Sequence, residues 1–406
     1  MMARAASATF RRSARAGSLE LSEIVRISEK ARAMRAAGED VLSFGTGEPD
    51  FPTPPHVIEQ TCAAMRQGAI RYPPTQGLPE LRQAICDDAG AQTGFSADPA
   101  EVIVSTGAKQ VLFNAFLATL DPGDEVILPA PYWTNYADIV GLVGGKAVRV
   151  DCGAELTLTP GRLRSAITPK TRWLVLNSPG NPSGKVYSRA ELEALAEVLR
   201  EFAQVWVMAD EIYQHISYEP FCSFRVAAPD LSDRTLIVNG VSKSYAMIGW
   251  RIGWGIGPVE LIRAMVAVQG QSTSPASVVS QIAACAALSG PQELLGERCE
   301  SFRRRRDLVV SAINAIEAVS CRVPGGAFYI FPDCRATYGL SAPDGTTIAD
   351  DSDYCGYILD SARVAIVPSR TFGLGGHFRL SYAYAEEDLV EGCRRIEAAT
   401  AALAPC

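Results

Sequence analysis

The stretch that decides the fold is "TLIVNGVSKSYAMIGWRIGWGIG", residues 235–257. It opens with an apolar β-rich run, places Lys243 between two serines, and closes on a second β-rich run that begins at Arg251. The chain has six lysines, and Lys243 alone follows a buried strand and precedes an aromatic, glycine-rich segment. A desolvated amine loses its proton more readily and becomes a nucleophile toward carbonyl groups. The alternative is a buried ion-pair lysine.

Five more β-rich runs precede this stretch, and amphipathic helical patterns such as residues 189–203 separate several of them. Alternating β and α patterns with near-continuous apolar strands predict an α/β fold, a mostly parallel seven-stranded sheet flanked by helices. The five runs are "EVIVST" (101–106), "DEVILPAP" (124–131), "KAVRVDC" (146–152), "RWLVLNSP" (172–179) and "VWVMADEIY" (205–213).

Three runs near the C-terminus predict a second, smaller α+β unit: "GGAFYIF" (325–331), "ARVAIVPS" (362–369) and "GGHFRLSYAY" (375–384). A chain of 406 residues is too long for one ordinary core. The N-terminal segment has too little core of its own, so we expect it to join the smaller unit. The predicted domains are a disordered leader (1–20), a small domain (21–50 and 300–406) and a large domain (51–299).

Composition excludes several classes of protein. Hydrophobic residues make up 48% and charged residues 20%, which argues against disorder. The net charge of −7, with no long basic run, argues against nucleic acid, and no apolar run is long enough to span a membrane. Eleven cysteines without a C-x-x-C pair predict free thiols, and three histidines make a metal site improbable. We therefore expect a cytoplasmic protein. The arginine-rich residues 1–18 fit either a transit peptide or a plain leader, and we favour the leader.

Polar residues follow the strands of the predicted sheet, at the edge where open α/β sheets bind ligands. Gly107 and Ala108, in "STGAKQ", form a small-residue turn before a helix, which suits a phosphate or is a plain turn. Asp210 ends an apolar strand, where a carboxylate needs a cation or a helix to cap. Asn177 and Asn181 lie in the rigid turn "NSPGNPSG". With Lys243, these elements match what pyridoxal phosphate requires: an amine, an anion for the ring nitrogen and a phosphate cradle.

The chain resembles the class I, fold-type-I pyridoxal-phosphate aminotransferases, most closely the bacterial aspartate and aspartate/prephenate enzymes. The resemblance covers residues from about Leu21 to the C-terminus. The motifs that carry it are "GEPDFPTP", "RYPPTQGLPELR", "STGAKQ", "DPGDEV", "PYW", "NSPGNPSG", "DEIY", "SKSYAMIGWRIGW" and "FRLSYA".

The resemblance implies a role for each residue at these motifs. Lys243 links to the cofactor aldehyde and then moves the proton between Cα and C4′, and Asp210 pairs with the ring nitrogen. Asn181 and Tyr213 contact the phenolic oxygen, and Trp133 stacks on the ring. The phosphate ligands are Gly107, Ala108, Ser242, Arg251 and, from the neighbouring subunit of a homodimer with shared active sites, Tyr72.

For the substrate, the resemblance implies that Arg379 holds the α-carboxylate, assisted by Gly47, Asn181 and Trp133. Lys109 either contacts a distal carboxylate or points to solvent. Ile24 and Ile248 stand where many relatives carry threonine, and an apolar Ile24 favours aromatic or aliphatic substrates. Arg370, where relatives often have glycine nearby, is a surface residue or a second cation at the substrate mouth.

The predicted function is transfer of an amino group between an L-amino acid, aspartate or glutamate first, and a 2-oxo acid. The alternatives are an aromatic or prephenate-type aminotransferase, and a lyase or Claisen-type synthase on the same fold. A pyridoxal-phosphate-sensing regulator is a further rival, but the roughly 20 residues before the match are too short for a DNA-binding domain.

Overall fold

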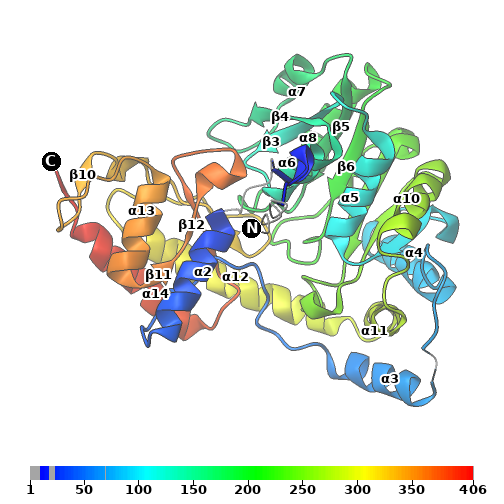
Figure 1. Ribbon diagram of the computed structural model, residues 1–406, viewed down its shortest axis with the longest axis horizontal. Helices are drawn as coiled ribbons and strands as arrows, with labels where there is room; N and C mark the ends of the chain where they lie inside the picture. Colours follow the sequence, from blue (N-terminus) through cyan, green and yellow to red (C-terminus); the bar gives the residue numbers. More distant parts are fainter. Residues whose placement is uncertain (1–9, 18–22, 69, 406) are drawn as a thin grey trace, which may run out of the picture.

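The computed structural model describes residues 10–17, 23–68 and 70–405 (Figure 1). Most of the leader predicted over residues 1–20 lies outside these ranges. Its described part contains one helical turn, α1 (Ala14–Gly17), which contacts α6 (Asn135–Val143).

A seven-stranded sheet forms the centre of the larger part of the molecule, as the sequence predicts. The strand order is β2-β8-β7-β6-β5-β3-β4, and every neighbouring pair is parallel except the two that involve β8. All seven β-rich runs of the sequence form strands. They are β2 (Val102–Ser105), β3 (Glu125–Ala130), β4 (Lys146–Asp151), β5 (Thr171–Asn177), β6 (Trp206–Asp210), β7 (Thr235–Gly240) and β8 (Gly253–Ile256).

Helices cover both faces of this sheet, because side chains alternate between the faces along each strand. In β5, Trp173 and Val175 pack with one set of helices, and Leu174 and Leu176 pack with the other. The first face carries α5 (Ala108–Thr119), α6 and α10 (Val259–Ser272). The second carries α4 (Pro79–Thr93), α7 (Pro160–Ala166), α8 (Arg189–Arg200), α9 (Phe224–Ala227) and α11 (Val278–Ser289), with α3 (Pro55–Arg66) packed on α11 (Figure 1).

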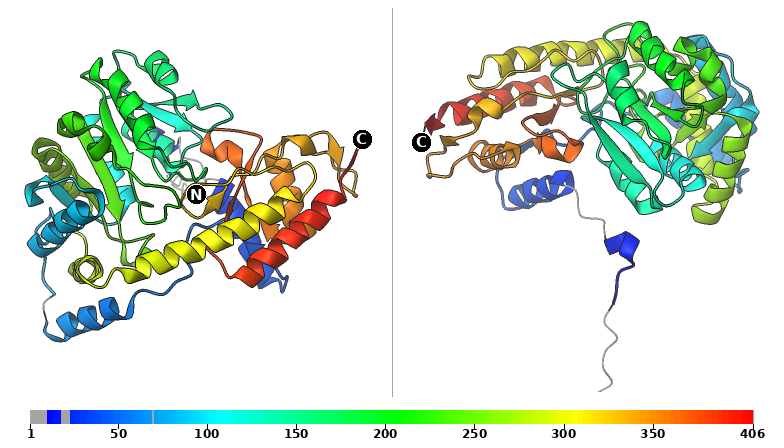
Figure 2. Two further views of the ribbon diagram at one scale, coloured as in Figure 1. Left: turned by 180° about the vertical axis from the view of Figure 1, so that it is seen from behind. Right: turned by 90° about the horizontal axis from the view of Figure 1, so that it is seen from above.

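The N- and C-terminal segments lie together beside the large sheet. Strand β1 (Leu42–Ser43) pairs in parallel with β11 (Val364–Ala365), so the start of the chain joins a sheet from its end. Figure 2 shows α12 and α14 side by side. The remaining elements are α2 (Glu23–Ala36), α12 (Glu293–Asn314), β9 (Tyr329–Ile330), β10 (Leu340–Ser341), α13 (Asp351–Tyr357), β12 (Val367–Pro368), β13 (Phe378–Ser381), α14 (Glu386–Ala401) and β14 (Ala404–Pro405).

This arrangement is the predicted smaller α+β unit built from both ends of the chain. Its core contains Phe44 from the N-terminal segment and Phe328 and Leu380 from the C-terminal segment. Helix α12 runs without a break across residue 300, where the sequence suggested a domain boundary. The domain boundaries themselves stay a prediction.

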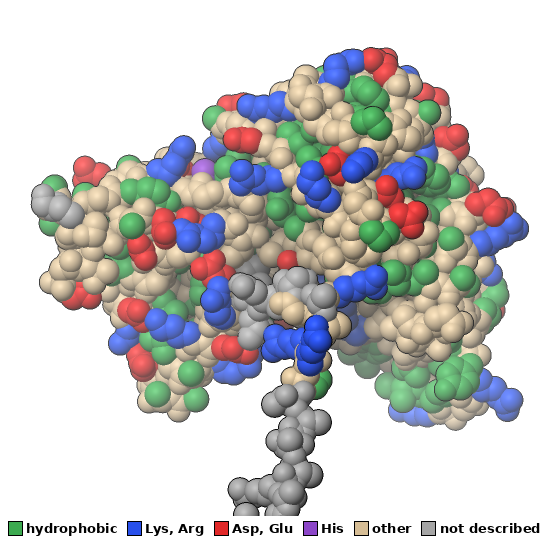
Figure 3. Space-filling view, turned by 45° about the horizontal axis from the view of Figure 1, so that its top comes forward, with side chains coloured by type: hydrophobic (Ala, Val, Ile, Leu, Met, Phe, Trp, Pro, Cys, Tyr) green, Lys and Arg blue, Asp and Glu red, His purple; other side chains and the backbone are tan. Residues whose placement is uncertain are grey.

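The surface and the thiols agree with the composition. Basic and acidic side chains are interspersed over the face shown in Figure 3. The ten cysteines within the described residues are free thiols. In the same part of the chain, no helix combines the length and the hydropathy that a membrane crossing needs.

The close packing of β8 on the turn before α5 generates a first prediction. A β-carbon on Gly253 would lie 2.2 Å from the backbone nitrogen of Ala108 and 2.6 Å from the carbonyl carbon of Gly107. Because both are backbone atoms, we expect Gly253→Ala to separate strand and turn. It should lower the free energy of unfolding in urea by about 1–3 kcal/mol.

The matched control for this prediction is Gly270→Ala, in α10, where a new β-carbon meets no atom within 4 Å. The higher helix propensity of alanine should leave this variant as stable as the parent or up to about 1 kcal/mol more stable. An equal loss of stability in both variants would contradict the packing argument.

Candidate active site

A cavity of about 430 Å³ opens where the strands of the large sheet end and the N-terminal segment crosses. That volume lies within the range of small-molecule sites. Its charged lining residues are four cations, Lys109, Lys243, Arg251 and Arg379, and two anions, Glu48 and Asp210. A chain with a net charge of −7 thus places a cationic excess of two (four minus two) around this cavity, which favours anionic ligands.

One end of the cavity is the turn that leads into α5. Gly107 has φ +84°, a left-handed conformation that favours glycine, and a β-carbon there would lie 2.6 Å from Nη2 of Arg251. The guanidinium group of Arg251 therefore packs on this turn. Ala108 begins the helix, so its first backbone N–H groups point toward the cavity end. Together, the helix N-terminus and the arginine form a cradle that suits a phosphate group.

Lys243 projects into the middle of the cavity from the loop after β7. Its Nζ donates a hydrogen bond to the carbonyl oxygen of Gly47, 2.7 Å away, on the N-terminal segment. Burial, and then the nearby charge of Arg379, lower the pKa of this amine to about 8. A larger share of Lys243 is therefore neutral near pH 7 than of an ordinary lysine, and the neutral form is the nucleophile.

Asp210 ends β6 at the floor of the cavity and is buried. Its Oδ2 accepts a hydrogen bond of 2.5 Å from the hydroxyl of Tyr136, and its Oδ1 accepts one of 3.3 Å from the backbone N–H of Ile212. Burial raises the pKa of the carboxyl to about 6, against the opposing effect of the Tyr136 hydrogen bond. Within the described residues Asp210 forms no salt bridge, so it suits a cationic group of a ligand.

Glu211, the next residue, faces away from the cavity. Its Oε1 accepts hydrogen bonds from the hydroxyl of Ser223 (2.9 Å) and the backbone N–H of Phe224 (3.0 Å), at the start of α9. Its Oε2 is buried, and no residue in the described part of the chain hydrogen-bonds it. Burial raises the pKa of this carboxyl to about 8, so the neutral acid predominates at pH 7.

A pair of tyrosines, Tyr213 and Tyr329, also lines the cavity. The hydroxyl groups of Tyr213 and Tyr329 lie 3.1 Å apart, and both side chains are buried. Burial raises the pKa of Tyr213 well above its usual value, so it stays a hydrogen-bond donor. A β-carbon on Gly47 would lie 1.9 Å from the Tyr329 hydroxyl, so the N-terminal segment can pass this wall only with glycine here.

Arg379 enters the cavity from β13. Its Nη1 donates to Oδ1 of Asn181 (3.0 Å), and its Nη2 donates to the carbonyl of Gly45 (2.5 Å). The Nε atom is buried and has no hydrogen-bond partner among the described residues. A buried guanidinium group without a carboxylate partner and with a spare donor suits the carboxylate of a ligand.

Lys109 and Trp133 lie together at the cavity mouth. The Nζ of Lys109 lies 5.0 Å from the ring centroid of Trp133, a cation–π contact. Burial, and then the charge of Arg251, lower the pKa of Lys109. Lys109 therefore lines the cavity while its side chain is also exposed to solvent.

The structure brings most of the predicted site residues to this one cavity. Eleven of the thirteen line it: Gly47, Ala108, Lys109, Trp133, Asn181, Asp210, Tyr213, Ser242, Lys243, Arg251 and Arg379. Gly107 contacts the cavity through Arg251. The exception is Tyr72, whose side chain is 94% exposed and faces away from the cavity of its own chain.

The other residues that the sequence singled out near the site have different surroundings. Asn177 hydrogen-bonds the backbone at Asn181 and Asp210, so its side chain is used in holding the loop. Arg370 pairs with Asp350, the N-cap of α13, and with Asp351, its first residue, which makes it a structural ion-pair residue. Ile24 lies in α2, outside the described side chains. Sequence reasoning missed Tyr136, whose only signal is its position three residues after Trp133, and Tyr329, which carried none.

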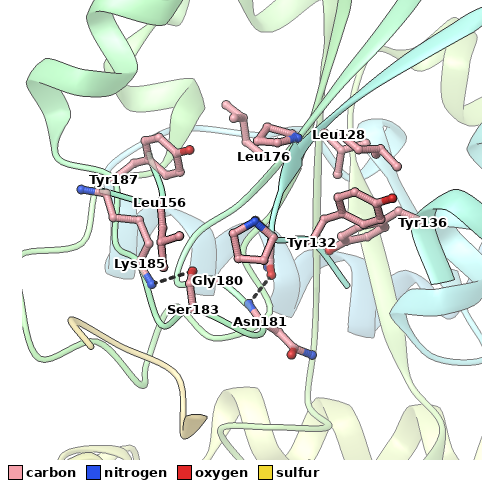
Figure 4. A pocket seen from close by; sticks show the side chains of 14 residues that line it. Leu128, Tyr132, Tyr136, Leu156, Leu176, Gly180, Asn181, Ser183, Lys185 and Tyr187 are labelled. Carbon is pink, nitrogen blue, oxygen red and sulfur yellow. Dashed lines mark hydrogen bonds between the residues drawn. The ribbon is translucent and has the colours of Figure 1, made fainter. Parts of the chain in front are cut away.

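A second, smaller cavity of about 30 Å³ lies behind the first and shares Tyr136, Asn177 and Asn181 with it. Figure 4 shows Tyr132 and Tyr136 on one side of it and Tyr187 and Lys185 on the other. The side-chain amide of Asn181 points out of this space, toward the main cavity and Arg379. The volume suits one or two waters rather than a ligand.

Comparison with known proteins gives a consistent result. Residues 39–396 match the model of the family "Aminotransferase class I and II". An aspartate aminotransferase of Rhizobium meliloti is 50% identical over 396 residues, which cover 97% of both chains. An aspartate/prephenate aminotransferase of Cereibacter sphaeroides is 49% identical, over 94% of this chain and 96% of that protein.

Solved structures agree with the sequence comparison. The crystal structure of the aspartate aminotransferase from Rhizobium meliloti superposes with a TM-score of 0.95 at 49% identity, covering 98% of this chain and 100% of that one. The aspartate aminotransferase of Thermus thermophilus, solved with maleate, has a TM-score of 0.89 at 40% identity, covering 96% and 100%.

The buried acid beside the cavity generates a prediction about pH. Glu211 has a folded-state pKa of about 8, above its ordinary value of 4.5. Its contribution to stability is therefore complete below about pH 4.5 and is lost as the pH rises through 8. In Glu211→Gln, which keeps an acceptor for Ser223 and Phe224, we expect the fall in unfolding free energy between pH 5.5 and 8.5 to be smaller.

Urea unfolding of the cofactor-free protein at several pH values measures this effect. Asp210, whose pKa is also raised, is present in both proteins, so the difference between the two slopes isolates Glu211. Identical slopes in the parent and the variant would show that Glu211 is ionised throughout.

Proposed function

This chain belongs to the aminotransferase class I and II family, and from that premise we propose that it moves an amino group between L-aspartate or L-glutamate and a 2-oxo acid. One observation carries the proposal: a single cavity holds a buried amine (Lys243), a buried carboxylate (Asp210) and a buried arginine with a spare donor (Arg379). The aminotransferase relatives do not favour a lyase, a synthase or a regulator.

Membership of the family implies use of pyridoxal phosphate, and the residues present fit that group. The turn at Gly107 with Arg251 would hold the phosphate, with Ser242 beside it. Asp210, which forms no salt bridge within the described residues, would hold the protonated ring nitrogen. Trp133 would cover one ring face, and Asn181 and Tyr213 would donate to the phenolic oxygen. When bound, the cofactor supplies an aldehyde for an amine and a ring that withdraws electrons.

In this proposal Lys243 has two tasks. Its amine, whose neutral form the lowered pKa favours, would be the group that holds the cofactor. The same Nζ would move the proton between the substrate Cα and C4′ of the cofactor. The carbonyl of Gly47, 2.7 Å from Nζ, orients the amine.

Two groups would orient the amino acid. Arg379 would bind the α-carboxylate through its spare Nε and an Nη group, with Asn181 and the backbone at Gly47 beside it. Lys109 would bind the distal carboxylate of a dicarboxylic substrate, since its ammonium lies over Trp133 at the mouth. The Thermus thermophilus structure with maleate, itself a dicarboxylate, supports this direction.

A second candidate substrate class is aromatic or prephenate-type. The Cereibacter sphaeroides relative carries aspartate and prephenate in its name. Val25, Leu112 and Ile248 add apolar surface to the cavity lining. These residues would accommodate a ring without excluding a dicarboxylate.

We further propose a homodimer with shared active sites. Tyr72 would reach the phosphate of the partner subunit, which accounts for its 94% exposure in one chain. Ile58, Met65 and Ile70, on and after α3, are also large apolar side chains that are exposed.

The same proposal includes a cytoplasmic location and the division into a leader (1–20), a small domain (21–50 and 300–406) and a large domain (51–299).

The role of Lys243 has a direct test. Lys243→Ala removes the linking amine and the proton carrier, and loss of a positioned acid–base group alone costs about 10²–10⁴-fold in rate. We expect loss of the visible absorption band of the lysine-linked cofactor and at least that loss of turnover, with circular dichroism unchanged.

The parent protein provides the positive control. Its visible band should decrease when L-aspartate or L-glutamate is added and recover with 2-oxoglutarate. A Lys243→Ala protein that turns over at the parental rate would overturn the assignment. A parental band that responds only to aromatic amino acids would shift the substrate to the second class.

The role of Lys109 is tested by substrate selectivity. Lys109→Ala removes one charge-assisted hydrogen bond to the distal carboxylate, worth about 1.5–3 kcal/mol. We expect kcat/KM for aspartate and glutamate to fall about 10- to 150-fold, with phenylalanine and alanine affected by less than about threefold. A uniform fall across all four amino acids would make Lys109 a residue of the cofactor site instead.

A further inference from the structure

We propose that Tyr136 is a positioning residue: from one helix it fixes both Asp210, which faces the ring nitrogen, and Trp133, which faces the plane of the ring. The inference rests on the proposed function, because it concerns how the cofactor ring is held. It assigns a task to a tyrosine that no motif in the sequence identified.

The contact with Asp210 crosses from α6 to β6. Tyr136 is 1% exposed, and its hydroxyl donates to Oδ2 of Asp210 over 2.5 Å. The other carboxylate oxygen accepts from the backbone N–H of Ile212. Each oxygen therefore has one directional partner, and the plane of the carboxylate is fixed before any ligand arrives.

The contact with Trp133 is made by the same ring. The centroids of the two aromatic rings are 5.4 Å apart with an interplanar angle of 88°, an edge-to-face pair. Trp133 precedes α6 by two residues, so it lies three positions before Tyr136 and the two side chains meet over one turn. Movement of Tyr136 would displace the group expected on the ring face together with the group expected at the ring nitrogen.

The hydroxyl also sets the charge of Asp210. Burial raises the pKa of that carboxyl, and the Tyr136 hydrogen bond and the charge of Lys243 oppose the rise. Two further ionisable groups interact with Asp210, namely Glu211 and Tyr213, and both are uncharged near pH 7 because burial raises their pKa. The cations Lys109, Arg251 and Arg379 line the same cavity. Tyr136 itself remains a donor, because burial and Asp210 raise its pKa well above 10.

Tyr136 also forms part of the wall, or partition, between the two cavities. Its side chain lines the main cavity and the small cavity behind it, with Tyr132 beside it (Figure 4). Phenylalanine at position 136 keeps the ring, the partition and the contact with Trp133, and it removes only the hydroxyl. The substitution therefore separates the proposed task from packing in the core on this face of the sheet.

The test compares Tyr136→Phe with the parent by three measurements. The first is the affinity of the cofactor-free protein for pyridoxal phosphate, by fluorescence titration. The second is the pH midpoint of the visible absorption change of the bound cofactor. The third is kcat and KM for aspartate. We expect the affinity for pyridoxal phosphate to fall about tenfold, because a charge-assisted hydrogen-bond network is weakened. The value of kcat should fall by a similar factor, and KM should stay within about twofold of the parent.

The direction of the pH midpoint follows from the charge on the ring nitrogen. Without the Tyr136 hydrogen bond Asp210 would be more basic, so a proton shared with the ring nitrogen would lie nearer the carboxylate and the ring would withdraw fewer electrons. The group joined to Lys243 then holds its proton more tightly, and the midpoint should rise in Tyr136→Phe. In an Asp210→Asn background, the same substitution should shift the midpoint no further.

Tyr132→Phe is the matched control, because Tyr132 lies beside Tyr136 but its side chain lines only the small cavity. It should match the parent within about twofold in all three measurements. An unchanged midpoint and affinity in Tyr136→Phe, even with lower stability, would make Tyr136 a packing residue and overturn the inference alone. A parent protein that binds no pyridoxal phosphate would overturn the proposed function as well.

Discussion

The site depends on the burial of one carboxylate, Asp210, at the end of a central strand. Strand β6 lies between β5 and β7, so its last residue is surrounded by structure and has little water to solvate a charge. A buried carboxylate without donors would cost several kcal/mol and would take up a proton instead. The fold supplies the hydroxyl of Tyr136 from α6, a backbone N–H from Ile212 and the charge of Lys243 from the loop after β7. These three elements are therefore held around one anion.

The same physics accounts for the balance of charge in the cavity. Four cations and two anions share a space of about 430 Å³, and burial lowers the pKa of Lys109 and of Lys243. Cations crowded in this way repel one another, so anionic ligands relieve the repulsion. A phosphate at one end and carboxylates at the other would do so. The scaffold thus favours a cofactor and a substrate that both bring negative charge.

Much of this arrangement could be predicted from the sequence, since it follows from local pattern. Seven apolar runs define the sheet, and polar residues directly after a run must lie at the carboxyl edge of the strands. Asp210 and Lys243 were found in this way. The role of Tyr136 could not be predicted in this way, because Tyr136 lies within a helix and a large ring there is equally expected as part of the buried apolar face. Tyr329 comes from the other end of the chain, and only tertiary structure brings its hydroxyl to Tyr213. The same holds for the substrate side of the cavity. Lys109 can be identified from its position in the turn before α5, but its contact with Trp133 cannot be predicted from the sequence.

The amine of Lys243 also joins the large sheet to the N-terminal segment through a hydrogen bond. The carbonyl that accepts its hydrogen bond belongs to Gly47, on the segment that follows β1. Strand β1 is in turn paired with β11, and Gly47 passes the Tyr329 hydroxyl too closely for any side chain. The position of the amine is therefore tied to the packing of the smaller α+β unit as well as to the large sheet. Lys243, the residue that carries the proposed chemistry, is thus held by contacts from both ends of the sequence. The N-terminal segment, which is short of a core of its own, contributes to them by packing against the C-terminal segment.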